Sequence, residues 1–234
     1  MKDFLAGIVD YAGLFPPATL SMADAVAEYA RARSGPDRWA LGRFVVPYAR
    51  LAELGRTDWE LSVIVDRPLD VPGAKSLEMK ATELDQIWRS RTPLFFEIPL
   101  DRLDLLHPIA ASGGRAKIRL ANTPPSAQVA AFLVACAATG LAFKATAGLH
   151  HPLRHAEGHG FLNLFLAAAL AKNGGREGDL VRLLEEREPF QFEAGAASWR
   201  GRKIPLAGVR SFATSFGSCS FQEPLDHLRE LKYL

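Results

Sequence analysis

The stretch Ala116–Ala147 reads AKIRLANTPPSAQVAAFLVACAATGLAFKATA, with a short apolar segment on each side of a longer one. Two prolines precede the predicted helix Ser126–Thr139, and Gly140 follows it, which is typical of a helix start and a helix end. The flanking segments are predicted strands, Ala116–Leu120 and Ala142–Ala147. Because a strand, a helix and a second strand in this order favour parallel pairing, the stretch predicts an α/β protein.

The same alternation runs through the rest of the chain. Six more strands are predicted at Ile8–Gly13, Arg43–Pro47, Leu61–Asp66, Ser76–Lys80, Leu94–Pro99 and Ser211–Gly217. The remaining helices are predicted at Ala23–Arg33, Tyr48–Gly55, Glu83–Arg89, Leu103–Ala111, Phe161–Lys172 and Pro224–Leu231. Eight strands favour one closed (β/α)8 TIM-like barrel over residues 1–234, with an open parallel α/β sheet as the alternative. Residues 173–210 read as an insertion, and residues 67–75 are too few for a full helix.

Composition restricts the class of protein. Hydrophobic residues make up 48% of the 234 residues, charged residues 23%, and the formal net charge is only +2. These values are typical of a soluble globular protein and predict neither a nucleic-acid nor a membrane partner. Two cysteines and a start without a signal peptide predict a cytoplasmic protein without a disulfide framework. We expect a small molecule as the partner, and the sequence leaves homo-oligomerisation open.

Charged and polar residues interrupt the predicted strands, although strands of such a barrel are normally apolar on both faces. Where a strand carries two of them, they are spaced by two, so they share a face. We expect this face to line the inside of the barrel near the carboxyl ends, where active sites of this fold lie. The residues are Asp10, Asp66, Glu78, Lys80, Glu97, Lys117, Arg119, Lys144 and Thr146.

Lys117 and Lys144 lie on consecutive predicted strands. A lysine becomes a nucleophile toward a carbonyl when it is desolvated or placed beside another cation. Together with Arg119, the two lysines are expected to lower one another's pKa. The alternative interpretation is that Glu97 or Glu78 neutralises them in buried ion pairs.

A histidine-rich segment follows the strand that carries Lys144. His150 and His151 come first, and His155 and His159 recur at four-residue steps, but Pro152 and Gly158 favour a loop over a helix. Three interpretations stay open: proton transfer or substrate contact by His150 or His151, a divalent metal such as zinc on His150, His151 and His155, or solvated histidines. His227, in a predicted helix, is interpreted as structural.

The last strand ends in Ser215-Phe-Gly-Ser-Cys-Ser220 and leads into the final helix. Gly217, Ser218 and Ser220 predict an anion site, because backbone N–H groups at a helix start attract anions. The alternative is a tight turn with capping serines. Cys219 as a nucleophile, with a base from the histidine segment, is a further alternative.

Five motifs together resemble a bacterial family of hypothetical proteins over nearly the whole chain. They are Asp10-Tyr-Ala-Gly-Leu-Phe-Pro-Pro, Gly42-Arg-Phe-Val-Val-Pro, Phe143-Lys-Ala-Thr-Ala-Gly-Leu-His-His, His159-Gly-Phe-Leu-Asn and Ser215-Phe-Gly-Ser-Cys-Ser-Phe. More loosely, Ala116-Lys-Ile-Arg and Phe143-Lys-Ala-Thr-Ala-Gly resemble the paired-lysine strands of class I deoxyribose-phosphate-type aldolases. This second resemblance implies Lys144 as the Schiff-base lysine and Lys117 as the residue that tunes it. The His-His loop departs from the aldolase pattern.

Three functions follow as hypotheses. The first is a cofactor-free lyase or aldolase for a small anionic carbonyl compound: Lys144 is the nucleophile, Lys117 assists it, and Glu97, His150 or His151 moves protons. Its substrate contacts are predicted at Arg119, Thr146, Gly217, Ser218, Ser220 and Asp10. The second is a metal-dependent hydrolase or isomerase that uses the histidine cluster and Glu97. The third is a protein that binds a small anion without turnover.

Overall fold

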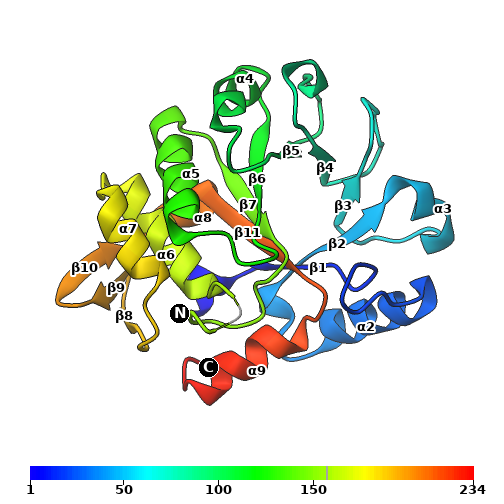
Figure 1. Ribbon diagram of the computed structural model, residues 1–234. Coiled ribbons are helices and arrows are strands. Elements are labelled where there is room, and N and C mark those ends of the chain that lie inside the picture. The colour runs from blue at the N-terminus through cyan, green and yellow to red at the C-terminus, as the bar shows by residue number, and fades with distance from the viewer. Residues whose placement is uncertain (157) are drawn as a thin grey trace.

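Eight parallel strands close into a barrel in the computed structural model, which describes residues 1–156 and 158–234 (Figure 1). The order around the barrel is β1-β11-β7-β6-β5-β4-β3-β2. The strands are β1 (Val9–Tyr11), β2 (Leu41–Pro47), β3 (Leu61–Ile64), β4 (Ser76–Lys80), β5 (Leu94–Glu97), β6 (Arg115–Arg119), β7 (Phe143–Thr146) and β11 (Ala213–Ser218). The predicted (β/α)8 TIM-like barrel is confirmed, and the alternative of an open sheet is wrong.

Helices of very different length connect these strands. The main ones are α2 (Met22–Ser34), α3 (Leu51–Leu54), α4 (Leu106–Ala111), α5 (Ser126–Thr139), α6 (Phe161–Lys172) and α9 (Gln222–Glu230). The predicted helix Glu83–Arg89 is reduced to a 3₁₀ turn at Leu84–Gln86. The predicted last strand begins later than expected, because a short helix, α8 (Val209–Phe212), occupies its first residues. A short helix α1 (Lys2–Leu5), which the sequence did not predict, precedes β1.

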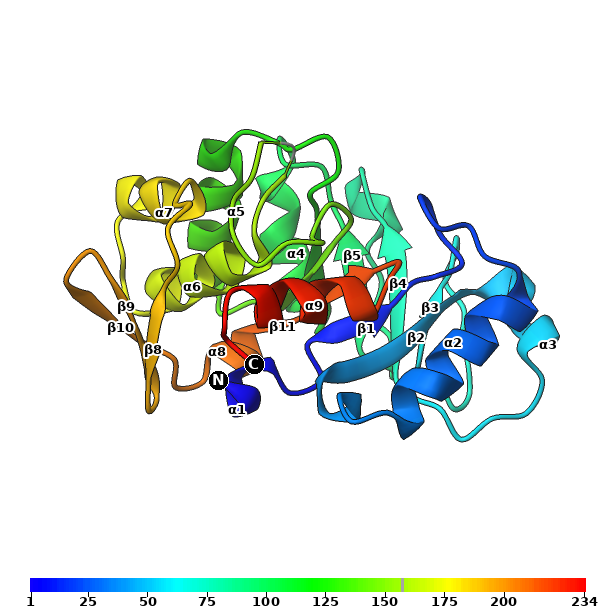
Figure 2. The same cartoon turned by 90° about the horizontal axis from the view of Figure 1, so that it is seen from below.

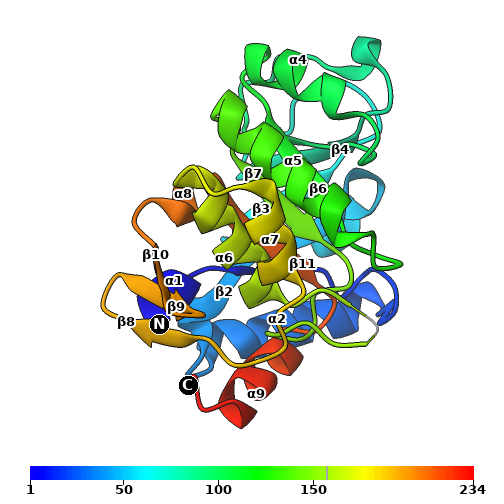
Figure 3. The ribbon, with the colours of Figure 1, turned by 60° about the vertical axis from the view of Figure 1, so that its left-hand side comes forward.

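The expected insertion folds into a helix and a small sheet at one side of the barrel (Figures 1 and 3). The helix is α7 (Glu177–Leu184), and the antiparallel strands are β8 (Gln191–Glu193), β9 (Ala196–Trp199) and β10 (Arg202–Pro205). α7 contacts both α5 and α6. Every residue of α6 from Phe161 to Ala171 is therefore buried, which accounts for a run that is apolar on all sides.

The two sides of each barrel strand meet different surroundings. Outward residues such as Phe96, Ile118 and Phe143 are fully buried in the apolar core between strands and helices. Residues on the opposite face of the same strands point into the barrel. Among them are Glu97, Lys117 and Lys144, which are buried as well. The interior is thus lined with charge and enclosed by an apolar layer.

The ends of the chain lie near each other, close to α1 and α9 (Figures 1 and 2). Among the described residues, no helix is long and apolar enough to span a membrane.

Candidate functional site

A buried network of ion pairs fills the interior of the barrel. The Nζ atom of Lys144 on β7 lies 2.6 Å from Asp10 Oδ2 on β1 and 2.6 Å from Glu78 Oε1 on β4. Lys144 is only 1% exposed. Its ammonium group also lies 5.6 Å from the ring centroid of Phe95 on β5. The lysine therefore makes two charge-assisted hydrogen bonds in an environment without bulk water.

Glu78 links this pair to a second lysine. Its Oε2 atom lies 2.7 Å from Lys117 Nζ on β6, and Glu97 Oε2 on β5 lies 2.8 Å from the same nitrogen. Burial alone raises the pKa of Glu78, but Lys117 and Lys144 outweigh it and hold the pKa well below its usual range. Burial likewise opposes the charge of Lys117, yet Glu78 and Glu97 raise the pKa of its ammonium group above the ordinary value. Both groups are therefore ionised at neutral pH.

These contacts decide between the two interpretations of the lysines. The expected mutual lowering of pKa is wrong for Lys117, because two carboxylates rather than cations are its nearest partners. The alternative, in which Glu78 and Glu97 neutralise the lysines in ion pairs, is confirmed. Chemistry at Lys117 would therefore have to start from an ammonium ion.

Hydroxyl and amide groups that the sequence reasoning missed complete the network. Ser62 Oγ donates to Glu78 Oε1 at 2.6 Å, and Ser215 Oγ donates to Asp10 Oδ2 at 2.7 Å. The backbone N–H of Arg43 donates to Asp10 Oδ1 at 2.8 Å. A Cβ atom at Gly42 would lie 2.4 Å from this Oδ1, so only glycine leaves room for the carboxylate there. The alternation of polar and apolar residues on β3 and β11 was the available signal for the two serines.

The other predicted strand residues lie nearer the carboxyl ends. Arg119 and Lys80 are exposed, and Thr146 is half-buried. Arg119 and Thr146 are paired in the register of β6 and β7, and Thr146 is paired with Gly217 on β11. Arg119 and Thr146 therefore lie at the carboxyl-end rim of the barrel, two residues beyond Lys117 and Lys144 on their strands.

Ser218, the last residue of β11, and Ser220, which follows the strand, have partners within their own turn. Ser218 is buried, and its hydroxyl accepts from the N–H of Ser220 at 3.4 Å. The hydroxyl of Ser220 accepts from the N–H of Glu223 at 3.2 Å, in the first turn of α9. This is the capping arrangement of the alternative interpretation. Anion binding by Gly217, Ser218 and Ser220 stays a prediction. Burial raises the pKa of the Cys219 thiol, which disfavours the thiolate that a nucleophile needs.

The histidine loop after β7 contacts helix α9, which follows β11. His150 Nδ1 lies 2.8 Å from Glu223 Oε2, and His227 Nδ1 lies 3.1 Å from the carbonyl oxygen of His150. The ring of His151 stacks on the ring of His227, with centroids 4.1 Å apart, and lies 4.2 Å from the ring of His155. Burial, with His227 and His155 adding to it, lowers the pKa of His151.

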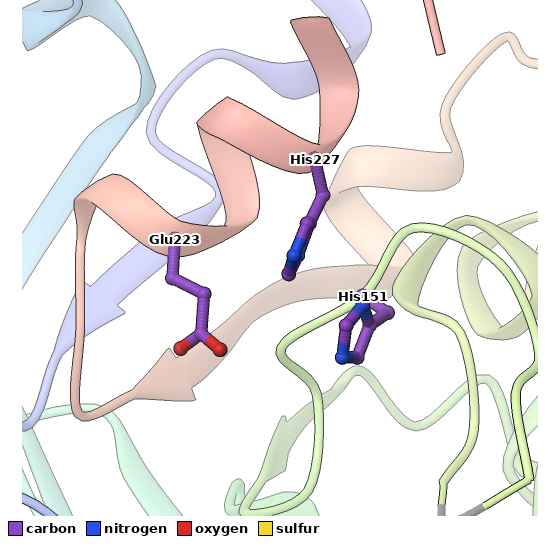
Figure 4. Close-up of side chains that lie close together, drawn as sticks. All are labelled: His151, Glu223 and His227. Carbon is purple, nitrogen blue, oxygen red and sulfur yellow. The ribbon is translucent and has the colours of Figure 1, made fainter. Parts of the chain in front are cut away.

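Three side chains from these two segments converge (Figure 4). One ligand atom each of His151, Glu223 and His227 lies within 4.8 Å of the others. The sequence reasoning missed this grouping, since it proposed His150, His151 and His155 as the metal ligands and interpreted His227 as structural. The available signal was the four-residue spacing of Glu223 and His227, which places both on one face of a helix.

His159 is fully buried and is not part of this grouping. Its Nε2 atom lies 2.8 Å from the carbonyl oxygen of Pro124 instead. Burial is the main cause that lowers its pKa.

No protein-family model and no curated protein sequence matches this chain. The fold is one that commonly supports enzymes, with active sites at the carboxyl ends of its strands. The charged network comes from strands of this barrel, and the histidine–glutamate grouping comes from the loop after β7 and from helix α9, which follows β11.

Proposed function

We propose that the protein is a lyase of the aldolase type that acts on a small anionic carbonyl compound through Lys144. The observation that carries the proposal is the position of Lys144 Nζ, 2.6 Å from two carboxylates inside the barrel. A buried amine next to groups that accept and return protons has what Schiff-base formation requires.

The reaction begins with proton transfer from the Lys144 ammonium group to the carboxylate of Asp10. The free amine then attacks the substrate carbonyl carbon to form a carbinolamine. Asp10 returns its proton to the carbinolamine hydroxyl, which leaves as water, so that a protonated Schiff base remains. Glu78 is held as an anion between two lysines and therefore stabilises the positive charge of that Schiff base.

The positively charged nitrogen of the protonated Schiff base withdraws electrons, and this promotes cleavage of a carbon–carbon bond of the substrate. A base, Glu97 or His150, removes the proton of the substrate hydroxyl, the carbon–carbon bond breaks, and its electrons form an enamine with the Lys144 nitrogen. An aldehyde is released. Protonation of the enamine carbon and hydrolysis of the resulting Schiff base release the second product and restore Lys144. Lys117 stays a cation throughout and holds Glu78 and Glu97 in place.

Basic groups near the rim support an anionic substrate. Arg119 is exposed at the end of β6. Arg154 belongs to the histidine loop, and its Nη1 atom is buried without a hydrogen-bond partner among the described residues. A buried guanidinium nitrogen is costly unless a ligand or a water satisfies it, so an acidic group of the substrate is a suitable partner.

Borohydride trapping tests this chemistry. The protein is incubated with short 2-oxo acids and aldehyde acids, reduced with borohydride and digested, and the modified peptide is identified by mass spectrometry. We expect a secondary amine at Lys144. Lys144→Arg keeps the positive charge and should lose the adduct at this position.

Lys80→Arg is the matched control, because Lys80 is an exposed lysine at the same end of the barrel. Its adduct yield at Lys144 should equal that of the unmodified protein. Adducts confined to exposed lysines, with none at Lys144 for any carbonyl compound, would show that the network is purely structural.

The grouping of His151, Glu223 and His227 favours a second candidate, a metal-dependent hydrolase or isomerase. In that case a metal-bound water acts as base or nucleophile in place of Lys144. Turnover that disappears with a chelator and persists in Lys144→Arg would favour this candidate over the lyase.

A further inference from the structure

We propose that His151, Glu223 and His227 form a binding site for a divalent transition-metal ion, with zinc as its best fit. The inference does not depend on the lysine chemistry. Two imidazoles and one carboxylate are a known ligand set of catalytic zinc, which leaves one position for water or substrate. The site lies between the loop after β7 and the first turns of α9 (Figure 4).

The first argument is the geometry of the donors. Glu223 and His227 lie one turn apart on α9, and both side chains point toward His151 on the facing loop (Figure 4). Donor atoms of a tetrahedral zinc site are about 3.4 Å apart, as follows from bonds of about 2.1 Å. The three donors here lie within 4.8 Å of one another, and binding of an ion would require side-chain movements that draw them closer, to that spacing.

The second argument is that one histidine is already fixed in the tautomer that a metal needs. His227 Nδ1 lies 3.1 Å from the carbonyl oxygen of His150, and a carbonyl oxygen only accepts. Nδ1 must therefore carry the proton, and the lone pair is on Nε2. A ligand histidine whose other nitrogen donates to a backbone carbonyl is the usual outer-shell arrangement of metal sites.

The third argument concerns the carboxylate. His150 Nδ1 lies 2.8 Å from Glu223 Oε2, so this oxygen is held by a neighbouring side chain, while Oε1 has no hydrogen-bond partner among the described residues and can bind an ion. The side chain of Glu223 is 42% exposed and that of His150 is 23% exposed, which gives an ion a path from solvent. His150 thus orients a ligand instead of being one. The proposed site therefore differs from the metal site predicted from the sequence, in which His150 is itself a ligand together with His151 and His155.

Direct metal binding tests the proposal. Protein without a histidine tag is stripped with a chelator, dialysed, and titrated with Zn²⁺ in competition with a chromophoric chelator. We expect one equivalent to bind. His227→Gln and Glu223→Gln should each weaken binding by more than about 100-fold, and His150→Ala by about 10- to 100-fold, as outer-shell partners do. Cobalt(II) should give the visible absorption of a tetrahedral site, and His227→Gln should abolish it.

His107→Ala is the matched control, because His107 is an exposed histidine on α4 and should bind zinc as the unmodified protein does. Thermal unfolding of stripped His227→Gln should match that of the stripped parent, which separates lost binding from lost folding. Less than one equivalent bound by the parent overturns the proposal. So does unchanged binding by His227→Gln. Borohydride trapping at Lys144 in stripped protein reports on the lyase alone, so the two proposals fail independently.

Discussion

At the scale of single residues, the carboxylate of Glu78 divides its two oxygens between two lysines, 2.6 Å from Lys144 and 2.7 Å from Lys117. Removing this charge leaves two buried ammonium groups with one carboxylate each. Loss of one partner from a buried ion pair costs about 3–5 kcal/mol. We therefore expect Glu78→Gln to lower the free energy of unfolding by about that amount, measured by urea denaturation.

Glu97→Gln is the comparison for this experiment. Among the described residues, the carboxylate of Glu97 forms an ion pair only with Lys117, and Lys117 keeps Glu78 when Glu97 is changed. Its loss should cost about 1.5–3 kcal/mol, the range for a hydrogen bond to a charged group. Equal losses in the two variants would contradict the bridging role of Glu78.

At this scale the sequence predicted which residues face the barrel interior but not how they pair. The alternation on each strand assigned Asp10, Glu78, Lys117 and Lys144 to one face, and all are buried there. Lys144, however, pairs with residues 134 and 66 positions away in the chain. Such partners depend on strand register and barrel closure, which a pattern along one strand does not contain. The carboxylate partners of Lys117 determine the direction of its pKa shift. Because the sequence did not reveal these partners, it predicted the wrong direction.

At the scale of elements, Asn163 joins α6 to two other segments. Its Nδ2 atom donates to the carbonyl oxygens of Leu183 and Glu186, at 2.8 and 2.7 Å, and its Oδ1 accepts from the N–H of Arg154 at 2.9 Å. Asn163→Ala removes the partners of the Glu186 carbonyl and the Arg154 N–H in a fully buried place, while the Leu183 carbonyl still accepts from the N–H of Glu186 at 3.2 Å. We expect a loss of about 2 kcal/mol or more in the free energy of unfolding, since each unsatisfied group costs about 1–3 kcal/mol.

Asn173→Ala is the matched control for this prediction. Asn173 lies at the exposed end of the same helix, where its Nδ2 atom donates to Ala169 O. Its replacement should cost no more than about 1 kcal/mol. Hydrogen exchange adds a local measurement: Asn163→Ala should speed exchange at the N–H of Arg154 in the histidine loop. Unchanged exchange there would show that Asn163 does not hold this loop.

Elements were predicted well where local signals are strong. α5 and α6 have the predicted bounds. Prolines before α5 and a glycine after it indicate where that helix begins and ends, and a long apolar run indicates α6. The segment Glu83–Arg89 has no such signals and forms only a 3₁₀ turn. The spacing of Glu223 and His227 is visible in the sequence, but their partner His151 comes from another loop, and only the closed barrel brings it near.

At the scale of the whole molecule, the charged interior predicts how stability depends on pH. The pKa of Glu78 is lower in the folded protein than in the unfolded chain, so its contribution is fully present above about pH 4.3 and is lost as pH falls through the folded value. The pKa of Lys117 is higher in the folded protein, so its contribution is fully present below about pH 10.4 and is lost as pH rises through the folded value. We expect a plateau of stability between these limits and a fall on both sides.

Urea denaturation at a series of pH values measures this profile. Added salt distinguishes the contribution of the interior ion pairs from that of the surface ion pairs. Exposed pairs such as Arg33–Asp58, with side chains 40% and 81% exposed, also lower carboxylate pKa values, but salt screens them. The buried network is screened much less. At about 0.5 M salt, the fall of stability below pH 4.3 should persist in the parent protein and be clearly shallower in Glu78→Gln. If high salt removes this fall in the parent, the surface pairs are its cause, and the interior network does not set the acid limit of the fold.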